Sequence, residues 1–341
     1  MQGSFMAVWS LREMKWIMLD RYGRTIDYMR ISLTDRCNLR CIYCMPEEGI
    51  HHIPRTELLG LDEILRICSL ASELGISRIK LTGGEPLVRR ICVPLVRELK
   101  RLPGIRQVTL TTNGVLLKEQ LPGLVEAGLD AVNISLDTLD KETFQKLTRR
   151  EELDQVLMGV EAALSYHSLK VKLNCVPTFQ CEEDLVKLAA FAREKPLHVR
   201  YIEMMPIGLG KEFTAKNEET VKELLEKTYG PMRPTQETLG NGPCHYYTLE
   251  NFQGRIGFIS ALSHKFCDQC NRIRLTSTGY LKGCLQFENG ADLKAKIRKG
   301  CSDEELRETI KKVIYEKPAG HNFQEKKNGK EESHIMAQIG G

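Results

Sequence analysis

Short β-rich runs alternate with helical stretches along the first two thirds of the chain. The β-rich runs are YMRISL (28–33), RIKLTGG (78–84), QVTLTTNG (107–114), AVNISLD (131–137), KVKLNCV (170–176) and VRYIEMM (199–205). Between them, stretches such as LDEILRICSLASEL (61–74) and EEDLVKLAAFARE (182–194) repeat apolar residues at helical spacing. Six β-α units predict an α/β fold in which parallel strands curve into a partial (β/α)6 TIM-like barrel. Functional groups should then lie on the loops that follow the C-terminal ends of the strands.

After about residue 210 the pattern changes. A helical stretch, ETVKELLEKTY (219–229), precedes two shorter strand candidates, CHYYTLE (244–250) and RIGFISA (255–261), and a final helix near SDEELRETIKKVIYE (302–316). We therefore predict three segments. They are an N-terminal extension (1–17), the barrel (18–210) and a smaller C-terminal α+β module (211–341).

A first set of three cysteines follows the first predicted strand. TDRCNLRCIYCMP (34–46) contains Cys37, Cys41 and Cys44, which we call the first triplet. A structural zinc site usually has four Cys or His ligands, so zinc would need a distant fourth ligand here. A [4Fe–4S] cluster held by three thiolates would instead keep one iron available for a small molecule.

A second set of three cysteines lies in the C-terminal module. FCDQCNRIRLTSTGYLKGC (266–284) contains Cys267, Cys270 and Cys284, which we call the second triplet. Zinc completed by His264 or His245 is one interpretation of this spacing. The repetition of an open three-cysteine arrangement favours two iron–sulfur clusters, one at each triplet.

Composition excludes several other classes of protein. A chain of 341 residues with 42% hydrophobic content can fill a substantial core. The net charge is only +4, and the sequence has no lysine–arginine block of the kind that binds nucleic acid. No apolar run of the sequence is long enough to cross a membrane. Twelve cysteines in a chain of this size, without a convincing export signal, favour metal ligands or reduced thiols over disulfides. We therefore expect a cytoplasmic protein.

The motifs resemble a known family. The first triplet with LTGGEPL after the second strand looks like the radical S-adenosylmethionine enzymes. The fuller set resembles the GTP 3′,8-cyclase family, which opens molybdenum cofactor biosynthesis. This set comprises DRYGRTIDYMRISLTDRCNLRCIYCMP, LTGGEPLVR, TTNG, NISLD, RYIEMMPIG, CDQCNRIRLT and the terminal HIMAQIGG. The motifs occur in family order from about residue 20 to residue 341.

The resemblance implies two [4Fe–4S] clusters and S-adenosylmethionine as cofactors. The first triplet would hold the cluster that binds S-adenosylmethionine, and the second would hold a cluster whose open iron binds the guanine base. By the same resemblance, S-adenosylmethionine would contact Tyr43, Gly84, Ser135 and Met205. A Gly-Gly turn lets a backbone approach a ligand closely, and a serine hydroxyl can bond to the ligand's polar edge.

The resemblance also implies a set of GTP-binding residues. They are Arg30, Lys80, Thr111, Lys172, Arg272, Ile273 and Arg274. Guanidinium groups suit phosphate oxygens because they donate two parallel hydrogen bonds. Lys80 departs from the family pattern, which usually has arginine there. Lysine keeps the charge but loses the bidentate fork, so the contact could pass to Arg78.

The implied reaction converts GTP to 3′,8-cyclo-7,8-dihydro-GTP by radical chemistry, a lyase activity. It implies an external electron donor and a downstream cyclic pyranopterin monophosphate synthase as partners, and it leaves monomer and homodimer open. Two alternatives remain. One is a peptide-modifying radical S-adenosylmethionine maturase with an auxiliary cluster, although such maturases usually carry more C-terminal cysteines. The other is a non-catalytic zinc-binding interaction protein.

The chain ends in HIMAQIGG, with Gly340 and Gly341 at its tip. A Gly-Gly tip is narrow and has no Cβ atoms, so it could enter a crowded pocket. The resemblance implies that this tail enters the active site and contributes to the reaction. Ile335, Met336 and Ile339 could seat it by burying apolar surface.

Overall fold

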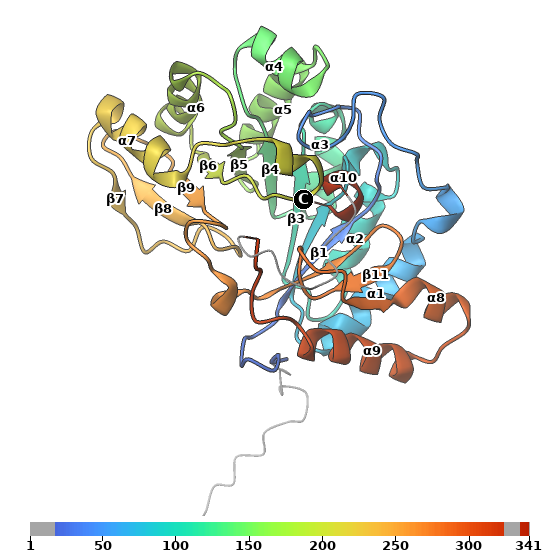
Figure 1. Ribbon diagram of the computed structural model, residues 1–341. Coiled ribbons are helices and arrows are strands. Elements are labelled where there is room, and N and C mark those ends of the chain that lie inside the picture. Colours follow the sequence, from blue (N-terminus) through green and yellow to red (C-terminus); the bar gives the residue numbers. More distant parts are fainter. Residues whose placement is uncertain (1–17, 324–334, 341) are drawn as a thin grey trace, which may run out of the picture.

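A computed structural model describes residues 18–323 and 335–340. The predicted extension (1–17) and the last residue, Gly341, lie outside the described residues. Six parallel strands pair in sequence order and form the barrel wall (Figure 1). They are β1 (Tyr28–Ser32), β2 (Arg78–Thr82), β3 (Gln107–Thr112), β4 (Ala131–Ser135), β5 (Lys170–Cys175) and β6 (His198–Ile202). Each coincides with a β-rich run of the sequence, so the predicted barrel is confirmed.

Helices cover the outer face of these strands. They are α1 (Leu61–Glu73), α2 (Cys92–Arg101), α3 (Leu117–Glu126), α4 (Lys141–Thr148), α5 (Leu153–Leu164) and α6 (Glu182–Glu194). Helices α3 and α4 were not predicted from the sequence. Pro122 lies inside α3, and proline is unfavourable in a helix interior. Asp140 caps the N-terminus of the short α4, because its side chain accepts a hydrogen bond from the Thr143 N–H.

The C-terminal module extends the same sheet at both edges. Its strand β9 (Ile256–Ile259) pairs in parallel with β6, and β10 (Arg272–Leu275) pairs in parallel with β1. Short antiparallel strands follow outward: β8 (His245–Thr248) and β7 (Arg233–Pro234) beyond β9, and β11 (Tyr280–Lys282) and β12 (Gly290–Asp292) beyond β10. The module therefore adds two parallel strands to the barrel wall. The boundary at residue 210 stays a prediction.

In the described part of the module, four helices accompany these strands. They are α7 (Glu218–Tyr229), α8 (Leu293–Arg298), α9 (Asp303–Tyr315) and the short α10 (Met336–Ile339) near the C terminus. Short 3-10 helices occur at Arg55–Glu57, Pro86–Val88, Gly208–Glu212 and Cys267–Gln269. Within the described parts of the chain, no helix combines the length and the apolar character that crossing a membrane requires.

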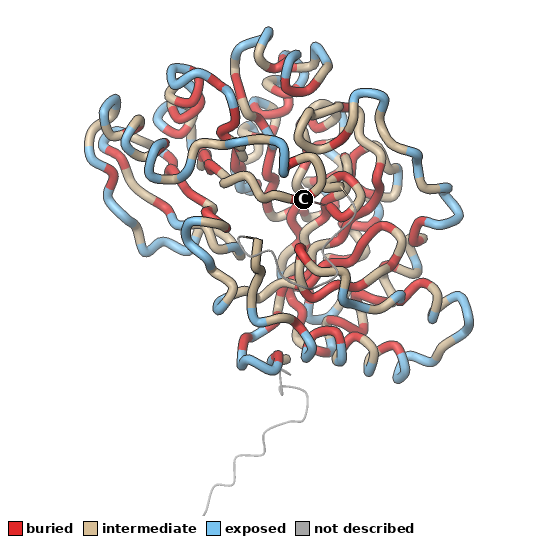
Figure 2. The backbone as a smooth tube through the Cα atoms, viewed as in Figure 1, coloured by how far each residue is buried: buried red, intermediate tan, exposed pale blue. Residues whose placement is uncertain are grey.

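Side chains alternate between the two faces of each strand. In β1, Met29 and Ile31 are fully buried in the core between the sheet and the helices, whereas Arg30 faces the inside of the barrel. Figure 2 shows buried chain along the strands and the inner sides of the helices. The period of two thus gives the sheet an apolar outer face and a mainly polar inner face.

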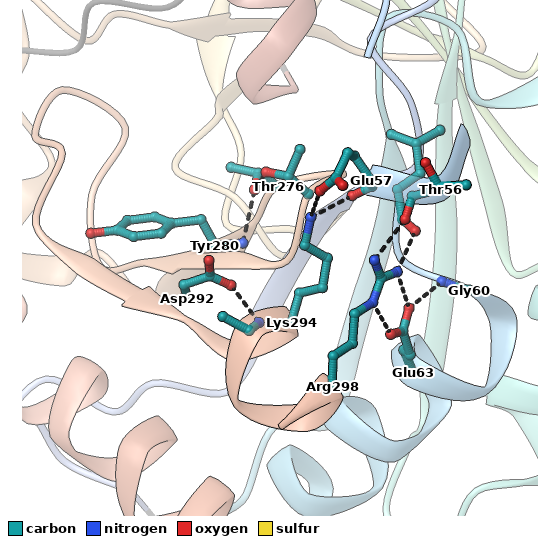
Figure 3. A network of polar contacts seen from close by, with 12 residues as sticks. Thr56, Glu57, Gly60, Glu63, Thr276, Tyr280, Asp292, Lys294 and Arg298 are labelled. Carbon is teal, nitrogen blue, oxygen red and sulfur yellow. Dashed lines mark hydrogen bonds and ion pairs between the residues drawn. The ribbon is translucent and has the colours of Figure 1, made fainter. Parts of the chain in front are cut away.

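A polar network joins the C-terminal module to the loop before α1 (Figure 3). The Lys294 ammonium donates to the Glu57 carbonyl oxygen at 2.9 Å and to its carboxylate at 2.5 Å. Arg298 binds the carboxylate of Glu63 through Nε at 2.8 Å and donates to the Thr56 carbonyl at 2.6 Å. Because only 11% of the Lys294 side chain is exposed, its contact should matter more than an ordinary surface pair.

We expect Lys294→Ala to lower the midpoint of thermal unfolding by about 2–4 °C, since it leaves the Glu57 carbonyl without this donor and removes a buried stem. Lys141→Ala is the matched control, because Lys141 pairs with Asp154 where both side chains are exposed. It should shift the midpoint by less than about 1 °C. Calorimetry of both variants would contradict the interpretation if the two shifts were equal.

Candidate active site

A cavity of about 380 Å³ lies inside the barrel, and both cysteine triplets line it. The inner faces of the strands form its wall. The polar strand residues that line it include Tyr28, Arg30, Lys80, Thr109, Thr111, Asn133, Lys172, Asn174, Arg200, Arg272 and Arg274. Loops beyond the strand ends and the C-terminal tail complete it.

The strand register places the two triplets at opposite ends of this cavity. The first triplet follows the C-terminal end of β1. In the second, Cys267 and Cys270 precede the N-terminal end of β10, which runs parallel to β1 with Tyr28 opposite Arg272. A five-residue strand spans roughly 15 Å. The expectation that functional groups gather at the C-terminal strand ends therefore holds for the first triplet, whereas the second lies at the other end.

The first triplet is held in a tight loop against α4. The Cys44 N–H donates to the Cys41 carbonyl at 2.9 Å, and the Arg40 N–H donates to the Thr148 carbonyl at 2.9 Å. Burial, with the Glu85 carboxylate nearby, raises the pKa of Cys37 to about 11. Burial and the neighbouring Cys37 raise that of Cys44 to about 12. These thiols therefore stay protonated unless a positive group binds them.

Positive charge surrounds the second triplet. Burial alone would raise the pKa of Cys270, but Arg272 and Lys317 lower it to about 6. The backbone N–H of His321 points at the Cys267 sulfur at 3.4 Å. Thiolate formation is thus favoured at Cys270, in contrast to Cys37 and Cys44 of the first triplet.

Both triplets fit iron–sulfur clusters. All six cysteines of the two triplets are partly exposed, form no disulfide and line one cavity. In contrast, Cys68, Cys92 and Cys175 are buried in the core. The Leu39 N–H and the Asn113 amide point at the Cys37 sulfur at 3.4 and 3.6 Å, as donors do toward cluster thiolates.

The zinc alternative lacks a preformed site. Among residues 18–323 and 335–340, no three His, Cys, Asp or Glu side chains could hold a metal ion together. A tetrahedral zinc ion needs four ligands at about 2.0–2.3 Å. His264, one predicted fourth ligand, is mostly exposed and pairs with Glu218 at 3.5 Å. His245 is exposed on β8.

The GGEP turn packs against the backbone that leads into the first triplet. A Cβ atom at Gly84 would lie 2.4 Å from the Arg36 carbonyl oxygen, so no side chain fits there. Glu85, the next residue, is fully buried and accepts hydrogen bonds from the Leu87 N–H, the Asn113 N–H and the Thr112 hydroxyl at 2.7–3.0 Å. Burial raises the pKa of Glu85 to about 7. Gly84 thus positions the cysteine loop as well as lining the cavity.

The remaining residues predicted to contact S-adenosylmethionine also line the cavity. The Tyr43 hydroxyl donates to the Asp137 carboxylate, which also accepts from the Val176 N–H at 2.8 Å. Burial raises the pKa of Asp137 to about 6. Ser135, at the end of β4, and Met205, just after β6, face the same space. The tyrosine side chain therefore joins the first cysteine loop to the strand that carries Ser135.

The cations predicted to bind GTP converge on the middle of the cavity. Arg30 lies opposite Arg274 on one side and Lys80 on the other in the strand register. Burial and the neighbouring guanidinium groups lower the pKa of Lys80 and of Arg274. Burial lowers the pKa of Lys172 to about 8, and its ammonium donates to the Leu239 carbonyl. Like charges held together in this way favour a polyanionic ligand.

Three further predicted contacts have distinct positions. Thr111 lines the cavity on β3, and so does Arg272 on β10. Ile273 points to the opposite face and packs in the core, so its side chain does not line the cavity. Arg78, the predicted substitute for Lys80, is bound to Asp27 at 2.7 Å and does not line the cavity. Lys80 itself therefore occupies this part of the wall.

The C-terminal tail contributes Met336 and Ala337 to the lining of the cavity. Figure 1 shows the described end of the chain, with α10, lying over the barrel strands. The Arg274 guanidinium donates to the Gly340 carbonyl at 3.0 Å. Met336 and Ile339 pack with Ile207 and Leu285 in a small apolar cluster. Gly340 has a φ of +77°, and a Cβ atom there would lie 2.7 Å from the Thr82 hydroxyl. Met336, Ile339 and Gly340 thus lie against the residues around the cavity, whereas Gly341 lies outside the described residues. The contribution of the tail to the reaction stays a prediction.

Sequence reasoning missed several residues that shape the site. Glu85 and Asp137 stood in quoted motifs, GGEP and NISLD, but received no role. Arg200 lines the cavity and binds the Asn174 amide oxygen at 2.9 Å through Nε. Arg24 donates to the carbonyls of Cys267, Pro318 and Ala319 at 2.6–2.7 Å, which ties the second triplet to the chain before the tail. Lys317 was not singled out at all.

Comparisons with known proteins agree with this site. The Radical SAM superfamily model matches residues 31–192, and the Molybdenum Cofactor Synthesis C model matches residues 197–323. The GTP 3′,8-cyclase of Clostridium perfringens (strain 13 / Type A) is 46% identical over 95% of this chain and 100% of its own length. That of Desulforamulus reducens is 42% identical over the same shares. The chain belongs to the GTP 3′,8-cyclase family.

Solved structures share the fold of this cyclase family member. Streptococcus suis SuiB superimposes with a TM-score of 0.57 at 16% identity and covers 87% of this chain and 68% of its own. SuiB bound to S-adenosylmethionine gives the same TM-score. At this identity the likeness concerns the fold alone.

We expect Gly340→Ala to release the tail, because a Cβ atom would meet Thr82 and a positive φ disfavours alanine by about 1–2 kcal/mol. Hydrogen exchange of the amides in α10 should accelerate by about tenfold. Gly242→Ala is the matched control, since nothing lies within 4 Å of the added atom. Equal protection in the variant and the wild type would contradict this account of the tail.

The charge contrast predicts a difference in thiol reactivity in cluster-free protein. Since the thiolate is the reactive form, alkylation of Cys270 should be half-maximal near pH 6 and fall as the pH drops below it. Cys37 should react only as the pH approaches about 11. Arg272→Ala should move the Cys270 midpoint upward. Mass spectrometry of alkylated peptides measures both midpoints, and coincident midpoints would refute the contrast.

Proposed function

We propose that this cavity binds S-adenosylmethionine at one end and GTP at the other and forms 3′,8-cyclo-7,8-dihydro-GTP, the first step of molybdenum cofactor biosynthesis. The observation that carries the proposal is that two cysteine triplets, at opposite ends of one cavity, share it with a central set of buried cations. The names of the relatives that match the full chain support the same substrate.

The reaction needs a hydrogen atom removed from C3′, a bond formed between C3′ and C8 of guanine, and then one electron and one proton. When bound, the two [4Fe–4S] clusters and S-adenosylmethionine supply the electrons and the carbon radical for this chemistry. The first triplet would hold one cluster, and the second triplet would hold the other.

The chain's own residues would orient the two substrates. Tyr43, Gly84, Ser135 and Met205 face the end of the cavity where S-adenosylmethionine would bind. Arg30, Lys80, Lys172, Arg272 and Arg274 line the cavity and would hold the triphosphate. Burial and neighbouring like charges lower the pKa of Arg30, Lys80, Lys172 and Arg274, and an anionic ligand would offset that cost.

The tail would help to exclude water. Gly340 and the apolar cluster around Ile339 occupy space between the strands and the loop at Ile207. A radical must meet only its intended partner, so a closed cavity that keeps the reacting atoms close favours the cyclisation. The electron donor, the downstream synthase and the oligomeric state remain predictions from the sequence.

An anaerobic assay with reductant, S-adenosylmethionine and one nucleoside triphosphate at a time tests the function. We expect GTP alone to yield both 5′-deoxyadenosine and the cyclised product. Alanine at all three positions of the first triplet should remove about half of the iron and abolish both products. Alanine at the second triplet should remove the other half and abolish only the cyclised product.

The same assay and an analysis of the bound metal also distinguish the proposed function from the two alternatives. A peptide-modifying maturase would form 5′-deoxyadenosine without consuming GTP. A zinc-binding interaction protein would contain zinc without iron after anaerobic purification. If 5′-deoxyadenosine persisted in the first-triplet variant, our assignment of the two ends of the cavity would be wrong.

A further inference from the structure

Unpartnered polar atoms gather beside the second triplet. Gln286 Nε2, His321 Nδ1 and Asn322 Oδ1 are buried and have no hydrogen-bond partner. In folded proteins nearly all buried polar atoms are paired, with the chain itself or with a ligand. Gln286 and His321 line the cavity, whereas Asn322 does not. The first two residues are therefore placed to meet a bound molecule.

Gln286 presents a donor to the cavity. It lies two residues after Cys284 and is only 2% exposed. Its Oε1 accepts a hydrogen bond from the Asn322 backbone N–H at 2.8 Å. Since that N–H can only donate, the amide orientation is fixed, and Nε2 is the atom left without a partner.

His321 presents an acceptor. Its Nε2 lies 2.8 Å from the Ala261 carbonyl oxygen, which can only accept, so Nε2 carries the hydrogen. The lone pair of the neutral ring is then on Nδ1, the unpartnered atom. The ring is held in place by Phe323, with centroids 4.7 Å apart, and the backbone N–H of His321 points at the Cys267 sulfur.

One donor and one acceptor next to the second triplet match the edge of guanine. Guanine has an acceptor at O6 and a donor at the 2-amino group, whereas adenine has a donor at position 6. We propose that Gln286 Nε2 donates to O6 and that His321 Nδ1 accepts from the 2-amino group, so that these two residues select the base. The inference rests on the proposed function, because it assumes that the base lies at the second triplet.

The 2-amino contact is tested with inosine triphosphate, which lacks that group. Holoenzyme is reconstituted anaerobically, its iron and sulfide are measured, and nucleotide affinity is determined by equilibrium dialysis without reductant. We expect the wild type to bind GTP about tenfold more tightly than inosine triphosphate. His321→Phe should weaken GTP binding about tenfold and leave inosine triphosphate binding nearly unchanged. His264→Phe, at a mostly exposed histidine, is the matched control and should keep the wild-type preference.

The O6 contact is tested by exchanging a donor for an acceptor. Gln286→Glu keeps an oxygen for the Asn322 N–H and replaces the Nε2 donor with a second oxygen. We expect this variant to prefer 2,6-diaminopurine riboside triphosphate, which has an amino group at position 6, over GTP. Gln253→Glu, at an exposed glutamine, should leave the preference for GTP unchanged.

The outcomes separate this inference from the proposed function. If the wild type bound ATP as well as GTP, the proposed function would fail. Suppose instead that the wild type prefers GTP. If both variants, Gln286→Glu and His321→Phe, then rank the nucleotides as the wild type does, only the base-selection proposal fails. An equal loss of GTP and inosine triphosphate affinity in His321→Phe would also overturn it, since that pattern indicates a structural role. If the His321→Phe variant loses iron, the base-selection proposal is tested by Gln286→Glu alone. It then fails unless that variant prefers 2,6-diaminopurine riboside triphosphate over GTP.

Discussion

The parallel pairing of β1 with both β2 and β10 is the constraint on which the site depends. β1 precedes the first triplet, and β10 follows the first two cysteines of the second. Because the two strands run in the same direction side by side, the triplets must lie at opposite ends of one wall. The same register brings Arg30, Lys80 and Arg274 into one layer between those ends. These two strand pairings thus determine both the separation of the two cysteine triplets and the charge between them.

The electrostatic environment changes along this wall. The first triplet lies near the buried carboxyl groups of Glu85 and Asp137, which disfavour further negative charge. The second lies near Arg272 and Lys317, which favour thiolate. Arg24 and Lys317 also donate to backbone carbonyls around the second triplet. These cations therefore hold the backbone next to the cysteines in place as well as adding positive charge there. The two ends of the cavity therefore differ in chemistry although both carry three cysteines.

Local patterns predicted much of the fold and of the site. The six β-rich runs match β1 to β6 because strand periodicity is visible within five residues. The cysteine triplets were evident from spacing, and the family resemblance supplied most of the basic residues. Helices α3 and α4 were not predicted from the apolar spacing. Pro122 lies inside α3 and argues against a helix, and α4 is only 8 residues long, too short for a clear helical repeat. Ile273 shared a motif with two cavity arginines, but alternation turns its side chain to the core.

The sequence by itself determined the strand–helix alternation, the two cysteine triplets and the resemblance to the cyclase family, since each is carried by neighbouring residues. Tertiary structure decided which distant segments share the cavity. The C-terminal strands could have formed a sheet of their own, yet β9 and β10 complete the barrel wall by pairing with β6 and β1. Gln286, His321 and Gly340 meet the site only after the chain has closed loops of dozens to hundreds of residues. Such contacts depend on packing across the whole fold, and no short stretch of sequence encodes them.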